Sequence, residues 1–290
     1  MYNRGEEEIE TIGLIAKIGD SSALRLLRSI IRHLSKHGLK VVVDADLKEH
    51  IQERVIFQEV KDFENIDLLM SIGGDGTLLR AIHEVPKVDK VLLLGINVGT
   101  VGFLNEVTVA KEGDIEELVE RLLRGDYLVE ECRMLRGEVT EAKKIMFALN
   151  EICIITQDHV KIPLFEVFKD DALVERCKAD GVILATKVGS TAYSGSAMGP
   201  VIDPGLDVIL LNHICPLRWG LRPIVFSPES FIKVKVSEAT CRVLYDGKEL
   251  GAFSPPFEVK VFLSDKRVRF VRFSKESFYR RLERRMGMLI

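Results

Sequence analysis

The sequence predicts an α/β protein in which an N-terminal, open and mostly parallel sheet with helices is followed by a β-rich, sandwich-like second domain. In the first part of the chain, continuous apolar runs alternate with helical patterns, which is typical of parallel strands covered on both faces. From about Tyr127, strand-like segments follow one another with turn signals between them. The length of 290 residues suits two domains of about 150 residues each.

The first part reads as a repeated strand–helix pattern. Apolar residues recur at helical spacing from Leu24 to Leu34, after the N-cap residues Asp20-Ser21-Ser22 and before a terminating Gly38. Four apolar runs predict strands, at residues 11–17, 40–43, 67–72 and 90–96, and two further helices are expected at 78–83 and 115–123.

The second part predicts an antiparallel layer structure. The strand-like segments are residues 144–156, 164–168, 181–185, 208–214, 231–236, 242–245, 257–263 and 267–273. Asp246-Gly247 predicts a tight hairpin turn. Residues 275–286 predict a basic helix, either a solvated helix with Phe278 and Leu282 packed inward or a functional basic face. We therefore expect domains at 1–125, joined by a C-terminal helix at 274–290, and at 126–273.

Composition and charge exclude several classes of protein. The 41 Lys and Arg residues against 44 Asp and Glu leave a net charge of -3, which argues against affinity for nucleic acid as a polymer. There is no apolar run of membrane-spanning length, and the acidic start does not resemble a signal peptide. The five cysteines are scattered without a Cys-x-x-Cys pair, which favours free thiols in the cytoplasm and predicts no metal held by protein ligands.

The most informative stretch is Gly73-Gly74-Asp75-Gly76-Thr77. It follows a predicted buried strand and precedes a predicted helix, so its backbone N–H groups and the helix dipole can face an anion. Its glycines permit close approach of a ligand to the backbone. A carboxylate in such a loop would repel phosphate unless it bound a metal or took a proton. The alternative is a tight turn in which Asp75 serves only turn geometry.

Two further stretches are candidates for ligand binding. An apolar strand at 181–185 runs into a segment rich in hydroxyls and small residues that ends at Ser196, which is either a plain Gly/Ser loop or a surface for a polar ligand. Asn150-Glu151 interrupts an apolar run and is either edge-exposed or faces a ligand. The sequence contains neither a P-loop nor a Gly-x-Gly-x-x-Gly fingerprint, and neither His-Glu-x-x-His nor a convincing nucleophile elbow.

Taken together, the 73–77 loop, Asn150-Glu151 and residues 180–196 resemble the NAD kinase family in order and separation. The resemblance extends from about residue 11 to the C-terminal helix, and its most specific part is residues 189–194. Arg222-Pro223 after Ile214-Cys215-Pro216 also resembles a family segment. The glycine-rich loop alone is less specific, since lipid kinases share it.

The resemblance implies transfer of the γ-phosphoryl group of ATP, with polyphosphate as an alternative donor, to the 2′-hydroxyl of the adenosine ribose of NAD, giving NADP. Asp75 would be the catalytic base, and Gly73, Gly74, Gly76 and Thr77 would form the phosphate loop. The residues implied to bind NAD are Asp75, Gly76, Arg80, Asn150, Glu151, Lys178, Asp180, Thr191, Ala192, Tyr193, Ser194 and Ser196. Residues 1–125 would be the phosphate-donor domain, and residues 126–273 the NAD-binding domain.

The resemblance further implies Mg²⁺ or another divalent cation brought with ATP, and a homo-oligomer, either a dimer or a tetramer. The chain departs from the family pattern at Lys187, Met198 and Lys248. Two alternatives stay open: a lipid or sugar kinase with a related loop, and a non-catalytic NAD-sensing protein. Near-neutral charge argues against a membrane-facing lipid kinase, and the presence of Asp75 argues against the sensor.

Overall fold

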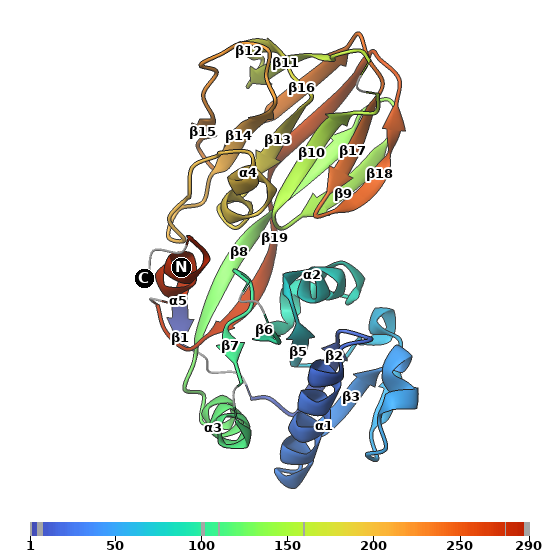
Figure 1. Ribbon diagram of the computed structural model, residues 1–290, viewed down its shortest axis with the longest axis vertical. Helices are drawn as coiled ribbons and strands as arrows, with labels where there is room; N and C mark the ends of the chain where they lie inside the picture. Colours follow the sequence, from blue (N-terminus) through green and yellow to red (C-terminus); the bar gives the residue numbers. More distant parts are fainter. Residues whose placement is uncertain are drawn as a thin grey trace. The chain divides into compact units, whose positions relative to one another are not determined.

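The computed structural model describes residues 2–4, 8–99, 102–109, 111–158, 160–275 and 277–286 (Figure 1). It forms two compact units, which we call unit 1 (residues 1–131 and 268–290) and unit 2 (residues 132–267). The chain passes between them within strand β8 (Leu128–Val139) and again within strand β19 (Phe257–Arg272). The unit boundary therefore falls inside strands rather than in a loop near residue 125.

Unit 1 is an α/β structure with a mostly parallel sheet, as the sequence predicts. Its strands run parallel in the order β19-β6-β5-β2-β3-β4, with β7 beside β6. The elements are β1 (Tyr2–Arg4), β2 (Thr11–Ala16), α1 (Ser21–Lys36), β3 (Lys40–Asp44), η1 (Ala45–His50), β4 (Ile56–Gln58), η2 (Val60–Asp62), β5 (Leu68–Gly73), α2 (Asp75–Glu84), η3 (Val88–Lys90), β6 (Leu92–Asn97), β7 (Val107–Thr108), α3 (Glu112–Leu123) and α5 (Ser277–Met286).

Local sequence explains where the helices of unit 1 begin and end. The carboxylate of Asp20 caps α1 by accepting hydrogen bonds from the backbone N–H groups of Ser22 and Ala23, at 3.0 and 3.2 Å. Gly38 follows the helix with a φ of 77°, which suits a residue without Cβ. Helix α2 starts at Asp75, three residues earlier than the apolar periodicity predicts. The second half of the glycine-rich loop is therefore the first turn of a helix.

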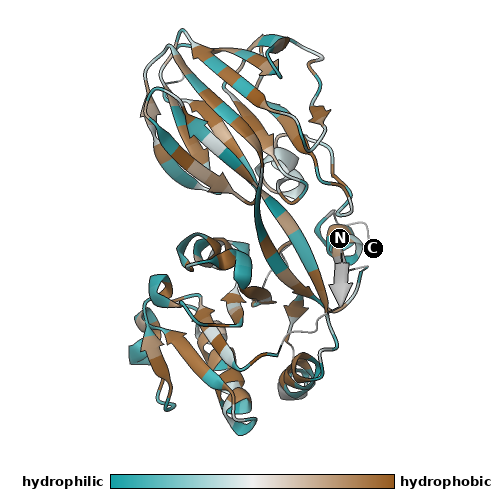
Figure 2. Ribbon diagram, turned by 180° about the vertical axis from the view of Figure 1, so that it is seen from behind, coloured by the Kyte–Doolittle hydropathy of each residue, from teal (hydrophilic) through white to brown (hydrophobic). Residues whose placement is uncertain are grey.

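Unit 2 consists of two antiparallel layers with a shared apolar core between them. One layer has the order β12-β11-β16-β19, with β8 beside β19 and β9 beside β8, and the other has the order β15-β14-β13-β10-β17-β18. Figure 2 shows the alternation of apolar and polar residues along these strands. The remaining elements are β9 (Lys144–Ala148), β10 (Glu151–Thr156), β11 (Leu164–Lys169), β12 (Ala172–Lys178), β13 (Gly181–Ala185), η4 (Gly189–Thr191), α4 (Tyr193–Ser196), β14 (Ile209–Ile214), β15 (Ile224–Phe226), β16 (Ile232–Ser237), β17 (Cys241–Tyr245) and β18 (Lys248–Phe253).

Two strand predictions in unit 2 are wrong in their extent. The run at 144–156 is two strands, because the chain turns at Leu149 and Asn150. The segments at 257–263 and 267–273 are one strand, β19, which continues through the polar residues between them. Strand β12 is absent from the prediction, because its exposed side chains at Ala172, Leu173 and Val174 break the apolar alternation.

A buried cluster of charges holds several segments of unit 1 together. Arg272, at the end of β19, donates from Nε to a Glu130 carboxylate oxygen at 2.7 Å and from Nη1 to the carbonyl of Leu104 at 2.8 Å. Glu106 lies 3.4 Å from the same guanidinium and accepts from Arg281 of α5 at 2.7 Å. The inward face of α5 therefore includes the buried Arg281 as well as the half-buried Phe278 and Leu282, the two residues that the sequence predicts to pack inward.

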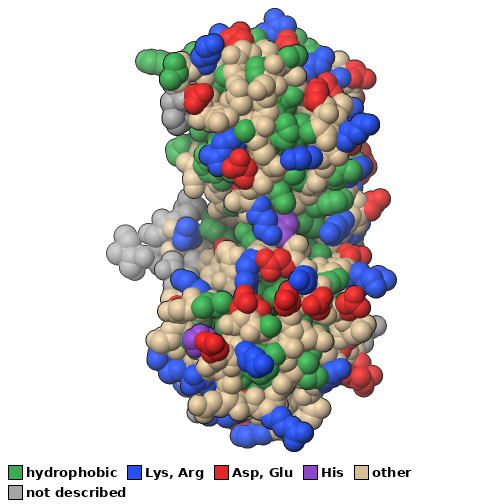
Figure 3. Space-filling view, turned by 90° about the vertical axis from the view of Figure 1, so that its right-hand side faces the viewer, with side chains coloured by type: hydrophobic (Ala, Val, Ile, Leu, Met, Phe, Trp, Pro, Cys, Tyr) green, Lys and Arg blue, Asp and Glu red, His purple; other side chains and the backbone are tan. Residues whose placement is uncertain are grey.

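No helix in the described part of the chain is long and apolar enough to cross a membrane. On the face drawn in Figure 3, basic and acidic side chains of the described residues are intermingled. This mixture agrees with the net charge of -3 and is unlike the basic surface that nucleic-acid binding needs.

We expect Arg272→Met to lower the free energy of unfolding by about 3–5 kcal/mol, because it removes the buried cation that pairs with Glu130 and one of the two cations beside Glu106. Urea denaturation measures the loss. The matched control is Arg124→Met, since Arg124 is an exposed partner of Glu120 and should contribute less than about 0.5 kcal/mol. Equal effects of the two substitutions would contradict the buried cluster as a source of stability.

Candidate active site

In unit 1, the glycine-rich loop lies at the carboxyl end of β5 and at the N-terminus of α2. Gly73 has a φ of 156°, and a Cβ added there would lie 2.7 Å from the Thr77 hydroxyl. A Cβ at Gly74 or Gly76 would meet nothing within 4 Å, so both glycines border open space. Such a turn lies at the carboxyl end of the parallel strands, where open α/β sheets bind ligands. Its accessible backbone N–H groups and the helix dipole can face an anion there.

Asp75 is held by a second glycine-rich segment. Its two carboxylate oxygens accept hydrogen bonds from the backbone N–H groups of Phe103 and Leu104, at 2.8 and 3.2 Å. A Cβ at Gly102 would lie 2.1 Å from the nearer oxygen, so only glycine permits this approach. Each oxygen keeps a lone pair for a further partner. Asp75 is therefore fixed in orientation while its carboxylate retains capacity to accept a proton.

Sequence reasoning missed this second segment. Gly95 lies within the buried strand β6, and Gly99 and Gly102 follow it, which is the same pattern of strand and glycines that identified the first loop. Asn105 joins the two segments, because its side-chain amide donates to the carbonyl of Gly73 and to the Asn97 side chain, both at 2.9 Å. The glycines near the end of a buried strand were therefore a signal in the sequence that could have identified this second segment.

Arg80 lies on α2 one turn after Asp75, but its guanidinium is already paired. It donates to the buried carboxylate of Asp44 at 2.9 Å. The two line a pocket of about 300 Å³ whose other charged residues include Asp46, Glu59 and Glu84. Contact of Arg80 with dinucleotide phosphates stays a prediction, because its surroundings here are mostly acidic.

In unit 2, Asp246 organises the Asn150-Glu151 pair. Its carboxylate, in the β17–β18 turn, accepts hydrogen bonds from the backbone N–H groups of Leu149, Asn150 and Glu151 at 2.7, 2.7 and 3.2 Å. Two turns that are distant in sequence are thereby joined. The sequence predicted Asp246 only as a hairpin residue, and nothing local to it indicated this longer-range contact.

Glu151 is the most unusual titratable group of this half. Its side chain is buried, and the carboxylate oxygen Oε2 has no hydrogen-bond partner among the described residues. Burial, with repulsion from Asp246, raises the pKa of Glu151 to about 7, although a hydrogen bond from the backbone of Tyr193 acts in the opposite direction. An unpaired buried carboxylate oxygen is costly, and a ligand hydroxyl would satisfy it.

The hydroxyl-rich segment folds against this pair and forms short helical turns, η4 and α4, rather than a loop. Thr186 donates from its hydroxyl to the carbonyl of Leu149 at 2.6 Å, and a Cβ at Gly189 would lie 2.0 Å from the carbonyl of Asn150. Within the segment, Ser194 is buried, Thr191 and Ala192 are half-buried, and Tyr193 and Ser196 are exposed.

A pocket of about 510 Å³ opens beside this segment. Its lining includes Tyr193, Ser196, Asn212 and Arg222, so it collects two of the predicted NAD-binding residues and the Arg-Pro segment that resembles the family. Lys187, a departure from the family pattern, is buried and lies 3.0 Å from a carboxylate oxygen of Asp207. That ion pair gives this lysine a structural partner.

The structure places Lys178 and Asp180 at the end of β12 and just before β13. The Lys178 ammonium is exposed and pairs with Glu238 at 2.6 Å. Asp180 is half-buried and makes backbone hydrogen bonds with Thr156 and Ile214, at 2.8 and 2.9 Å. Unit 2 thus brings together Asn150, Glu151 and the 186–196 segment directly, while Lys178 is held by its own ion pair.

Comparison with known protein families shows which family the chain belongs to. The ATP-NAD kinase N-terminal domain matches residues 12–127, and the ATP-NAD kinase C-terminal domain matches residues 149–273. The chain belongs to the NAD kinase family. Among curated NAD kinases, those of Methanothermobacter thermautotrophicus and Thermococcus kodakarensis are 35% and 34% identical to it, over 95% and 92% of this chain and 95% of each relative.

Solved structures of NAD kinase family members share the fold. An NAD kinase from Archaeoglobus fulgidus in complex with ATP is 26% identical, with a TM-score of 0.74 over 97% of this chain and 100% of that one. Yeast NADH kinase complexed with NADH has a TM-score of 0.89 at 22% identity, over 97% of this chain and 89% of that one. The α/β unit and the antiparallel β-rich unit are thus the architecture of the family.

We expect Gly102→Ala to lower the free energy of unfolding by about 1–3 kcal/mol, because the added methyl group overlaps the Asp75 carboxylate. Gly113→Ala is the matched control: its Cβ would meet nothing within 4 Å in the exposed first turn of α3, so its effect should be neutral or stabilising. Chemical denaturation of both variants tests this. An unchanged stability of Gly102→Ala would contradict the tight packing of Asp75.

We expect Glu151→Gln to stabilise the protein at pH 8 by about 3 kcal/mol and to have little effect at pH 5. The folded-state pKa of about 7 exceeds the ordinary value of 4.5, so the folded state binds the proton more tightly and the wild type loses stability as pH rises between these values. Urea denaturation at both pH values measures the difference. Glu249→Gln, at a half-exposed ion pair with Arg242, should change stability by less than about 1 kcal/mol at either pH.

Proposed function

We propose that this NAD kinase family member transfers the γ-phosphoryl group of ATP to the 2′-hydroxyl of the adenosine ribose of NAD, producing NADP. Unit 1 supplies the phosphate loop at residues 73–77 and the catalytic base Asp75. Unit 2 supplies Asn150, Glu151 and residues 191–196 as hydrogen-bonding groups for NAD, with Lys178 and Asp180 toward the nicotinamide end. Polyphosphate is the alternative donor.

Asp75 has the geometry of a general base. Two backbone N–H groups fix its carboxylate, and the remaining lone pairs can accept the proton of the attacking ribose hydroxyl. As the proton leaves, the hydroxyl oxygen forms a bond to the γ-phosphorus, and the bond from that phosphorus to the bridging oxygen of ADP breaks. The N-terminus of α2 and the open backbone at Gly74 and Gly76 stabilise the charge on the transferring group.

The residues of unit 1 also fit a divalent cation that arrives with the nucleotide. Mg²⁺ prefers oxygen ligands and keeps much of its coordination on phosphates and water, so it needs few protein donors. Asp75 offers carboxylate oxygens with free lone pairs beside the phosphate loop. The cation supplies charge neutralisation of the phosphates.

The observation that carries the proposal is the unpaired buried oxygen of Glu151. A structural carboxylate at this depth would have its hydrogen bonds satisfied, as Asp246 has with three N–H donors. Glu151 instead keeps one oxygen without a partner among the described residues, next to Asn150, whose side-chain amide both donates and accepts. A ribose diol presents the two hydroxyls that such a pair would bind.

We further propose that the enzyme works in the cytoplasm as a homo-oligomer, a dimer or a tetramer. All five cysteines are free thiols, and four of them are buried, which suits a reducing compartment. Size-exclusion chromatography with light scattering would determine the number of subunits.

We expect Asp75→Asn to lower the rate of NADP formation by about 100-fold or more and to leave NAD affinity within about threefold. NADP is measured after mixing purified protein with ATP, Mg²⁺ and NAD, and affinity by calorimetry. The control is Asp89→Asn, at an exposed aspartate of η3, which should behave as the wild type.

Undiminished turnover of Asp75→Asn would contradict its role as the base. A wild-type protein that binds NAD but forms no NADP from either ATP or polyphosphate would favour the NAD-sensing alternative. Phosphorylation of a lipid or sugar in place of NAD would favour the other kinase class.

A further inference from the structure

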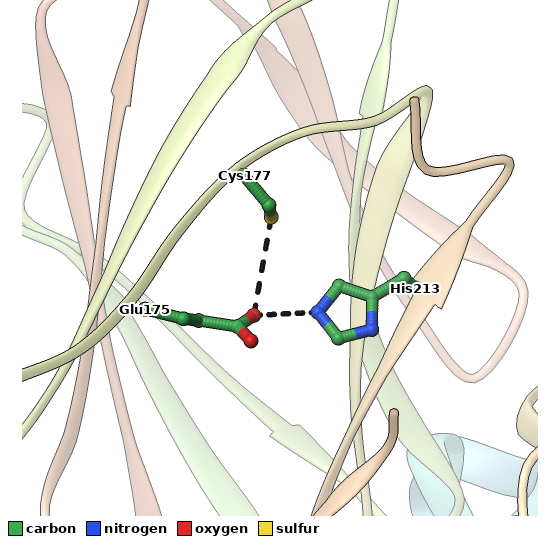
Figure 4. Close-up of side chains that lie close together, drawn as sticks. All are labelled: Glu175, Cys177 and His213. Atoms are coloured by element: carbon green, nitrogen blue, oxygen red, sulfur yellow. Dashed lines mark hydrogen bonds and ion pairs between the residues drawn. The ribbon is translucent and has the colours of Figure 1, made fainter. Parts of the chain in front are cut away.

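Unit 2 contains a second group of chemically active side chains outside the residues assigned above. Glu175 and Cys177 of β12 and His213 of β14 direct one ligand atom each toward a common point, and these three atoms lie within 4.8 Å of one another (Figure 4). The Nε2 atom of His213 is 2.5 Å from Oε1 of Glu175, and the Cys177 sulfur is 3.9 Å from the same oxygen.

Strand alternation explains how the cluster forms inside the sandwich. Glu175 and Cys177 are two residues apart on β12 and therefore face the same side. On β14, His213 follows Ile209 and Leu211 in the positions that face the apolar core of unit 2. The three side chains thus meet between the two layers, where β12 is the last strand of its layer.

The cluster is buried to a degree that is unusual for these residue types. The side chains of His213 and Glu175 are 3% and 11% exposed, and Cys177 is 3% exposed. Among the described residues, the Glu175 carboxylate makes its hydrogen bonds with the His213 imidazole and the Cys177 thiol. His213 also lines the pocket of about 510 Å³, which gives solvent a route to the cluster.

We propose that Glu175, Cys177 and His213 form a binding site for a zinc-class divalent cation that links β12 to β14. Thiolate, imidazole and carboxylate are the ligands that Zn²⁺ uses in proteins, whereas Mg²⁺ avoids sulfur and nitrogen. Tetrahedral Zn²⁺ with bonds of about 2.0–2.3 Å needs ligand atoms about 3.3–3.8 Å apart. The observed separations between the three ligand atoms, from 2.5 Å to at most 4.8 Å, bracket that range. Small side-chain rotations would therefore bring the three atoms to the spacing that Zn²⁺ needs.

Binding has a defined proton balance. Cys177 binds as the thiolate and releases its proton to solvent. The proton that Nε2 of His213 shares with Glu175 is also given up by that nitrogen: it passes to solvent, and a neutral imidazole is kept by a proton on Nδ1. Nε2 then binds the cation, and Glu175 exchanges its hydrogen bond with that nitrogen for a bond to the cation. A water molecule entering from the pocket completes four-coordination. The site is distinct from the cation that accompanies ATP and does not depend on the proposed phosphoryl transfer.

The test uses the full chain, freed of metal with a chelator and then equilibrated with Zn²⁺ or Co²⁺. We expect about one Zn²⁺ per chain after desalting, an undiminished amount in the presence of excess Mg²⁺, and a thiolate-to-cobalt charge-transfer band in the Co²⁺ form. Cys177→Ser should abolish the band, and Cys177→Ser with His213→Asn should reduce bound Zn²⁺ to near zero.

The matched control is Cys241→Ser. Cys241 is another buried cysteine of unit 2, and burial raises the pKa of both thiols to about 12. Its sulfur donates to the carbonyl of Ala239 at 3.7 Å, and among the described residues it belongs to no group of three potential metal ligands. This variant should bind Zn²⁺ as the wild type does. Circular dichroism confirms that each variant is folded.

Three results would overturn the proposal: a wild-type protein that binds no Zn²⁺, a Co²⁺ form without the thiolate band, or equal loss of Zn²⁺ in Cys241→Ser. The last two would mean that the metal does not bind at Cys177. None of these results bears on NADP formation, so the two proposals fail independently.

Discussion

The buried guanidinium of Arg272 is the charge that ties together several segments of unit 1. It joins Glu130 near the start of β8, the carbonyl of Leu104 and, through Glu106, the helix α5. Because Phe103 and Leu104 also donate their N–H groups to Asp75, the same short segment is fixed on one side by a cation and on the other by the candidate base. A buried charge without a counter-charge is expensive, and in this cluster both arginines lie beside carboxylates.

Unit 2 has an equivalent constraint in the Asp246 carboxylate, which accepts three backbone N–H groups from the turn at 149–151. Asp246 and Glu151 are close enough to repel each other, yet their environments differ. Asp246 is surrounded by donors, whereas Glu151 keeps a buried oxygen without a partner in the described structure, and its pKa rises to about 7. The Asp246 carboxylate therefore stabilises the fold, whereas the Glu151 carboxylate has an oxygen that can accept a hydrogen bond from a ligand.

Sequence patterns predicted the architecture well where strands are buried on both faces or a turn needs particular residues. The parallel strands of unit 1 are buried on both faces and therefore read as continuous apolar runs, and the hairpin at Asp246-Gly247 has the residues that its turn requires. Prediction missed β12, which is largely exposed, and the polar middle of β19, because such residues carry no alternation of apolar character. It also missed β8 (Leu128–Val139), which is mostly buried but carries charged residues along its length. The glycine-rich segment at 95–102 was visible in the sequence, but its role depends on contact with Asp75, which no local pattern encodes.

The sequence by itself determined the fold class, the glycine-rich loop at Asp75, and the family that the motifs resemble in their order, because these reside in short contiguous stretches whose backbone requirements select residue types. Only the tertiary structure decided which groups hold them: Gly102 beneath Asp75, Asp246 beside Asn150, and His213 near Cys177. These partners lie far apart in the chain, as the separation of 38 positions between Glu175 and His213 illustrates. Their contacts follow from strand order and register, which are set by the packing of whole sheets and not by any segment alone.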